Sequence, residues 1–265
     1  MRRRRVALAA LFAVAIAPAA WADEEIDKLR EGFEQAQRKF YDEVRALHDK
    51  GDREAGQKLY AARAHVKEFA PRFAAYAEKH AGKPEAIPAL VWMVANPLEE
   101  PAPGKPSAGA QQALKTLTEK HAADAGIAAQ FEALGAASWT CGDDAALAFF
   151  ERVARENKDK EAVAGAKYNV GLIHYQYAEW PADDGKAKPD ADERRKKAVD
   201  LFRAVAKEHA GTAGAAQAEP FIFELDRLQV GMTAPDFEGP GLDEKTIKLS
   251  QFRGKVVVID FWGFW

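Results

Sequence analysis

The sequence predicts a mainly α-helical protein whose last part is the start of an α/β fold, and three observations support this class. Residues 24–228 are rich in Ala, Glu, Lys, Arg and Leu, and their apolar residues lie three and four positions apart, as on one face of a helix. Segments rich in Pro and Gly divide this region into helical lengths. After Leu228 the composition changes to Gly, Pro, Asp and β-branched residues, which indicates strands and turns.

The overall composition is that of a globular protein. The chain has 265 residues, of which 48% are apolar and 30% charged. These values fit one large domain or two smaller ones. The net charge of −3 and the isoelectric point near 6.1 give no indication of a nucleic-acid partner.

Residues 1–22 have the three parts of a secretory signal peptide. Arg2 to Arg5 form a basic start, Val6 to Ala17 form an apolar stretch, and Ala20 to Ala22 form a small-residue cleavage site. The alternative is an uncleaved anchor, but about twelve apolar residues fall short of the roughly 20 that span a bilayer. We therefore expect cleavage after Ala22, export to the periplasm or the medium, and no membrane span in the remaining chain.

The helical region begins with an apolar stripe and is broken by three polar segments. The first helix carries its stripe from Leu29 to Leu47, and Gly51-Asp52 is expected to end it. Residues 96–109 contain four prolines and are predicted to form a loop, as is the polar segment 181–192.

A loose repeat runs through residues 23–228. Four amphipathic helices each close on a polar turn, followed by a linker of small residues and a second helix. The equivalent turn positions are His80, His121, Asn157 and His209, at intervals of 41, 36 and 52 residues. Repeats of this length indicate stacked helical hairpins of the tetratricopeptide kind, although the full consensus of that repeat is not met.

The repeated histidines have two interpretations. They are metal ligands, or they complement the negative end of the helix dipole at the last turn. They lie tens of residues apart without local ligand spacing, so the sequence favours the second interpretation and predicts neither a metal nor a cofactor.

Four aromatic residues in the segment AKYNVGLIHYQYAEW also have two interpretations. Tyr168, Tyr175, Tyr177 and Trp180 line a peptide-binding groove, or they pack between helical hairpins. Packing is the favoured interpretation, because aromatic residues at helical spacing most often belong to a core.

Cys141 is the one cysteine of the sequence. An exported protein meets an oxidising compartment, but one cysteine makes no internal disulfide and no Cys-x-x-Cys pair. Its interpretations are a reactive or intermolecular thiol, or a small apolar residue near a helix start. We favour the apolar residue.

The segment 229–265 is predicted to begin a second domain. Thr246 to Leu249 is typical of a short strand, and Ser250 to Arg253 of one helical turn ending on Gly254. Val256 to Phe261 is apolar except for Asp260, which is typical of a strand buried on both faces of a sheet.

This segment resembles the start of the redoxins, which comprise exported thioredoxin-like thiol-disulfide oxidoreductases of the TlpA type and AhpC/TSA peroxiredoxins. The resemblance is carried by Gly231, Ala234-Pro235-Asp236-Phe237, Leu242-Asp243, Leu249-Ser250, Phe252-Arg253-Gly254-Lys255 and Val256 to Trp262. It implies a thioredoxin-like fold after residue 228. It also implies thiol-disulfide exchange or peroxide reduction, with a redox partner protein, a small disulfide or a peroxide as substrate.

The resemblance also implies where the reactive group belongs. In the family the segment Asp-Phe-Trp-x-x-Trp leads directly into Cys-x-x-Cys, so the nucleophile is expected after Trp265 and no catalytic residue is present in the sequence itself. Asp260 matches a buried acid that moves protons under the site, although a strand-end residue bonded to backbone is the alternative. Trp262 and Trp265 match aromatic residues that shield the site.

Three explanations account for a sequence that stops at this point: an incomplete fragment, a nonsense mutation, or a UGA codon that encodes selenocysteine. Without the rest of the fold, we expect residues 229–265 either to lack order or to pack on the helices. A second functional hypothesis is a helical-repeat scaffold that binds a protein or peptide and carries a vestigial redoxin tail.

Overall fold

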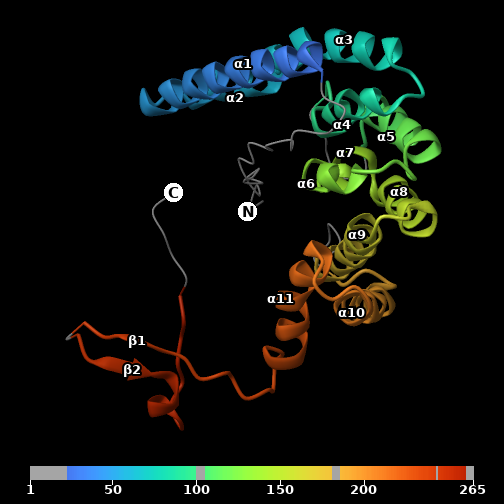
Figure 1. Cartoon of the computed structure of the whole chain (residues 1–265). Coiled ribbons are helices and arrows are strands. Elements are labelled where there is room, and N and C mark those ends of the chain that lie inside the picture. The colour runs from blue at the N-terminus through green and yellow to red at the C-terminus, as the bar shows by residue number, and fades with distance from the viewer. Residues whose placement is uncertain (1–22, 100–104, 181–185, 243, 261–265) are drawn as a thin grey trace.

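The computed structural model describes residues 23–99, 105–180, 186–242 and 244–260. The helices follow one another along a curved stack, and a small hairpin of strands lies beyond the last helix (Figure 1). The predicted signal peptide, Trp262 and Trp265 lie outside the described residues.

The bounds of the elements follow the chain. The α-helices are α1 (Glu24–Asp49), α2 (Arg53–Ala62), α3 (Ala64–Lys79), α4 (Ile87–Ala95), α5 (Ala108–Lys120), α6 (Phe131–Leu134), α7 (Ala137–Cys141), α8 (Asp143–Glu156), α9 (Lys160–Glu179), α10 (Ala191–Glu208) and α11 (Ala213–Arg227). The short 3₁₀ helices are η1 (Pro84–Ala86), η2 (Ile127–Gln130) and η3 (Leu249–Phe252), and the strands are β1 (Glu238–Pro240) and β2 (Thr246–Lys248).

The first helix illustrates how the sequence sets these bounds. The carboxylate of Asp23 accepts hydrogen bonds from the backbone N–H groups of Glu25 and Ile26, both at 3.0 Å, and so caps the N-terminus of α1. The predicted stripe is confirmed, since Leu29 and Phe33 are buried on the face of α1 that packs against α3.

The repeated polar turns are confirmed as helix ends. His80, His121, Asn157 and His209 occupy the C-cap positions of α3, α5, α8 and α10. Three of these helices pair with the helix that follows, in the hairpins α3–α4, α8–α9 and α10–α11. The assignment to the tetratricopeptide kind stays a prediction.

The second repeat differs from the expected hairpin. After α5 the chain forms η2, α6 and α7, three short pieces instead of one helix. Gly126 and Gly142 border these pieces with φ of 79° and 89°. This left-handed backbone bounds the second arm at its two ends, whereas the breaks inside the arm, at Gln130 and at Gly135-Ala136, keep right-handed φ values.

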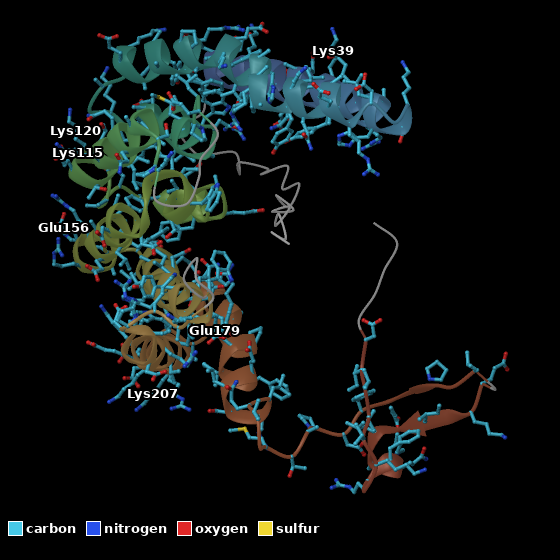
Figure 2. The ribbon with its side chains drawn as sticks, turned by 180° about the vertical axis from the view of Figure 1, so that it is seen from behind. Lys39, Lys115, Lys120, Glu156, Glu179 and Lys207 are labelled. Carbon is cyan, nitrogen blue, oxygen red and sulfur yellow. The ribbon has the colours of Figure 1, made fainter. Side chains whose placement is uncertain are left out.

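Two main apolar cores lie inside the stack. In the first, the rings of Phe73 and Trp92 stack at 4.0 Å between centroids, and Phe33 meets Trp92 edge-on at 4.9 Å. The second joins α4, α5, α8 and α9, with Leu117 and Phe149 fully buried at its centre. Charged residues occupy the outer side of the stack, where Figure 2 labels Lys115, Lys120 and Glu156.

The last two helices approach closely through glycine. A Cβ on Gly214 of α11 would lie 2.7 Å from the backbone carbonyl carbon and oxygen of Ala164 in α9. Real Cβ atoms essentially never approach a backbone so closely, so this crossing depends on the missing side chain.

The secondary structure of the C-terminal part agrees only partly with the prediction. Strands β1 and β2 pair antiparallel, with Gly239 opposite Ile247, and η3 follows directly, which confirms the expected strand and turn. The predicted strand from Val256 is wrong for the described residues, because 256–260 form no strand and are exposed. A strand needs a neighbour to hydrogen-bond with, and β1 and β2 pair only with each other.

Among the described helices, none combines the length and the apolar character needed to cross a bilayer.

Candidate functional site

The residues that carry the redoxin resemblance are joined by hydrogen bonds. The carboxylate of Asp236 accepts one bond from the backbone N–H of Ser250 at 2.8 Å and another from its hydroxyl at 2.7 Å. These bonds from Ser250 hold the pKa of Asp236 below its usual range. The backbone N–H of Leu249 also donates to the carbonyl of Phe237 at 3.0 Å. The motif Ala-Pro-Asp-Phe is thus fastened to the turn Leu-Ser-Gln-Phe.

An ion pair between Lys248 and Glu238, at 2.9 Å, joins the two strands of the hairpin. Both side chains are more than half exposed, so the pair contributes little. The hairpin therefore offers a small scaffold held mainly by backbone bonds and by Asp236.

Asp260 is exposed and lies in a segment without strand partners. Its expected role as an acid under the reactive group therefore stays a prediction. Trp262 and Trp265 lie outside the described residues, so their expected roles also stay predictions.

Cys141 lies in the core and not at a site. Its side chain is 1% exposed at the end of α7, and its Sγ lies 3.5 Å from the hydroxyl of Thr140. Burial raises the pKa of the thiol, which disfavours the thiolate that redox chemistry requires. The interpretation as a small apolar residue is confirmed.

Two aromatic residues of α9 are packed as expected. Tyr168 and Tyr175 both contact the rings of Phe202 in α10 and Phe221 in α11. The hydroxyl of Tyr175 donates to Glu224 at 2.7 Å, which satisfies its polar end. These contacts confirm hairpin packing for this pair.

The other two aromatic residues differ from that expectation. The ring of Tyr177 lies under the Lys188 ammonium and the Arg194 guanidinium, each 4.0 Å from the ring centroid. Trp180 is 61% exposed at the end of α9. Both therefore lie at the surface of the stack instead of inside it.

A shallow groove of about 280 Å³ runs between α8, α9 and α10. Its lining residues are Glu151, Ala154, Arg155, Lys167, Val170, Lys197 and Leu201. Apolar residues therefore adjoin three cations and one acid. Each cation already pairs with an acid of this chain: Lys197 with Glu151, Lys167 with Glu208 and Arg155 with Glu156.

Two buried histidines were not singled out by the sequence analysis. His65 in α3 and His174 in α9 are 9% and 5% exposed, and burial lowers the pKa of each to about 4. Each lies in an amphipathic or apolar stretch of helix. Its position within that stretch is the sequence feature that could have indicated its burial. Their chemistry is that of neutral core residues.

Comparison with known proteins gives short, partial similarities. The chain is 34% identical over 56 residues to the protein named "Thiol-disulfide oxidoreductase ResA" of Bacillus thuringiensis (strain Al Hakam) and to that of Bacillus anthracis, which is 21% of this chain and 32% of each relative. It is 42% identical over 45 residues to the protein of that name from Geobacillus thermodenitrificans (strain NG80-2), which is 17% of this chain and 26% of the relative.

No protein-family profile matches the chain. No solved structure gives a significant match. The chain spans about a third of the length of the first curated relatives it matches. The similarity supports a thioredoxin-like redox function at the level of the family.

Proposed function

We propose that residues 229–265 belong to the thioredoxin-like domain of an exported thiol-disulfide oxidoreductase or peroxiredoxin-like antioxidant protein. The observation that carries the proposal is the bonded pair Asp236 and Ser250, which joins two motifs of the redoxin resemblance in one small unit. The partial similarity to thiol-disulfide oxidoreductases supports the same chemistry.

The proposed reaction needs a thiolate or selenolate, placed directly after the segment that ends at Trp265. Attack on a disulfide forms a mixed disulfide and releases one thiolate, and a second cysteine of the enzyme then displaces the substrate sulfur. Attack on a peroxide forms a sulfenic or selenenic acid and releases the alcohol or water. Asp260 would carry protons to and from the second cysteine, and Cys141 takes no part.

The decisive experiment is an activity measurement on the natural gene product. The coding region is expressed in its source with its downstream sequence, and the purified protein is assayed for reduction of insulin disulfides and of hydrogen peroxide. Mass spectrometry of the same protein identifies Cys or selenocysteine at the proposed position. The variant Cys141→Ala should keep full activity. A product that contains neither residue there, or that reduces neither substrate, would refute the proposal.

A second candidate function is favoured by the groove between α8, α9 and α10. We infer that the helical stack binds a protein segment whose apolar centre contacts Val170 and Leu201 and whose acidic ends compete with Glu151 and Glu208 for the lysines beside them. Chemical cross-linking of the natural protein in its own cells tests this. Partners that are lost in Leu201→Asp and kept in the outer-side variant Lys115→Asp would support it, whereas equal capture by both variants would contradict it.

A further inference from the structure

Three residues that are far apart in sequence meet where α1 begins and α3 ends. Asp23 and Glu25 open α1, and His80 is the C-cap of α3. One ligand atom from each of these side chains lies within 4.8 Å of those of the other two. Two carboxylates and one imidazole are typical ligands of divalent transition metals.

Polar atoms without partners converge on the same place. The Nε2 atom of His80 and one carboxylate oxygen of Glu85 are buried and complete no hydrogen bond with the described residues. The Tyr76 side chain is 2% exposed, and its ring stacks on His80 at 4.4 Å. Buried polar groups left in this state cost stability, so they call for a ligand or a bound water.

The electrostatics of this cluster favour a cation. Asp23, Glu25 and Glu85 all contribute negative charge to Tyr76, which places three acids around one phenol. The ammonium of Lys79 meets Glu25 at 2.5 Å, but that pair is more than half exposed on the lysine side. An exposed pair of this kind contributes little stability, so losing it would add little to the cost of binding a metal ion.

The carboxylate of Asp23 is able to cap α1 and to ligate at once. Its Oδ1 accepts the two backbone N–H bonds that start the helix, which leaves Oδ2 for another partner. A tetrahedral zinc site with bonds of roughly 2.0–2.2 Å needs its ligand atoms about 3.3 Å apart.

We propose that Asp23, Glu25 and His80 bind a divalent transition-metal ion of the Zn²⁺ class. Tyr76 and Glu85 stand beside the ion and supply hydrogen bonds to a water or to a ligand oxygen. The ion joins the start of α1 to the end of α3, and so closes a chain segment of more than fifty residues. Such a closure stabilises the folded protein by restricting the unfolded chain.

The test measures zinc binding to the full chain without a histidine tag, after treatment with a chelator. Calorimetry with Zn²⁺ alone should show one ion per chain, and the melting temperature should rise when zinc is added. His80→Ala should weaken zinc binding by about 100-fold. Asp23→Asn should also weaken it, while keeping α1 capped, because Asn is as good an N-cap as Asp.

The matched control is His209→Ala. His209 holds the equivalent C-cap of α10 and is not part of the carboxylate cluster, so this variant should bind zinc as tightly as the parent chain. Circular dichroism of each variant shows whether the helices are retained. The proposal is overturned if the parent chain binds no stoichiometric zinc, or if His209→Ala loses as much affinity as His80→Ala.

Discussion

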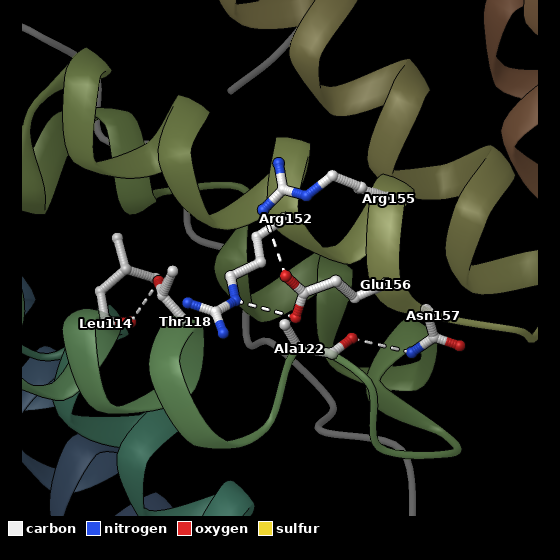
Figure 3. A network of polar contacts seen from close by, with 7 residues as sticks. All are labelled: Leu114, Thr118, Ala122, Arg152, Arg155, Glu156 and Asn157. Carbon is white, nitrogen blue, oxygen red and sulfur yellow. Dashed lines mark hydrogen bonds and ion pairs between the residues drawn. The ribbon is translucent and has the colours of Figure 1, made fainter.

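Asn157 connects two neighbouring repeats, and replacing it is expected to lower the free energy of unfolding. Its side chain is 8% exposed at the C-cap of α8. The amide donates to the carbonyl of Ala122 at 2.9 Å, drawn in Figure 3, and to that of Asp124 at 3.1 Å. Its oxygen accepts from the backbone N–H of Asp159 at 2.9 Å. One side chain thus ties the turn after α5 to the start of α9.

The expected cost of Asn157→Ala follows from these bonds. Three hydrogen bonds at about 1 kcal/mol each give a loss of about 3 kcal/mol in the free energy of unfolding. The carbonyl of Ala122, a residue that is 3% exposed, would then lack its partner, so water does not easily compensate. For a chain of this size such a loss corresponds to a fall of about 6–12 °C in the melting temperature.

The matched control is Asn169→Ala. Asn169 is also 8% exposed, but its amide donates only to the carbonyl of Gly165 within the same helix. This variant should lose about 1 kcal/mol or less. Urea unfolding followed by circular dichroism measures both variants, and amide exchange at Asp159 reports the local opening. Equal costs for the two substitutions would refute the reasoning, as would a loss below 1 kcal/mol for Asn157→Ala.

Three further predictions concern close packing, pH and thiol access. Gly214→Ala forces a Cβ against the backbone of α9 and should lower the free energy of unfolding in urea by about 1–3 kcal/mol. The control Gly109→Ala should not destabilise the chain, because its Cβ meets nothing closer than 4.0 Å. An unchanged free energy of unfolding for Gly214→Ala would contradict the close crossing of α9 and α11. Burial lowers the pKa of His174 to about 4, so the unfolded chain binds its proton first as the pH falls below 6.5. The free energy of unfolding should therefore drop by about 2 kcal/mol from pH 7 to pH 5 on account of this residue, and His174→Gln should show a smaller drop unless the assignment is wrong. Ellman's reagent should label Cys141 slowly in the folded chain and completely in urea, and rapid labelling of the folded chain would be at odds with its burial.

The sequence predicted the ends of helices better than what lies between them. A polar residue at the close of an apolar stripe is a local signal, so His80, His121, Asn157 and His209 were all located correctly. The break of the second repeat into short pieces was missed, because the breaks at Gln130 and at Gly135-Ala136 keep right-handed φ values and contain no proline that would mark a helix end.

The local sequence pattern could not predict contacts between residues that are distant in the chain. The bond from Asn157 to Ala122 and the meeting of Asp23 with His80 depend on how the hairpins stack, which no spacing of residues in the chain encodes. The predicted strand from Val256 failed for a related reason, since strand formation is a property of a pair and the described residues supply no partner. The histidine at position 80 was rightly placed as a cap, and its neighbours become visible only in three dimensions.

The curved stack has a mechanical consequence. Its extensive contacts join helices that are near neighbours in the chain, from α1–α3 through α5–α8 to α10–α11. A force applied between the two ends acts on these contacts one after another. Each helical hairpin is therefore displaced slightly from its neighbour before any hydrophobic core unfolds. We therefore expect the helical region to extend like a spring under tension before any single helix unfolds.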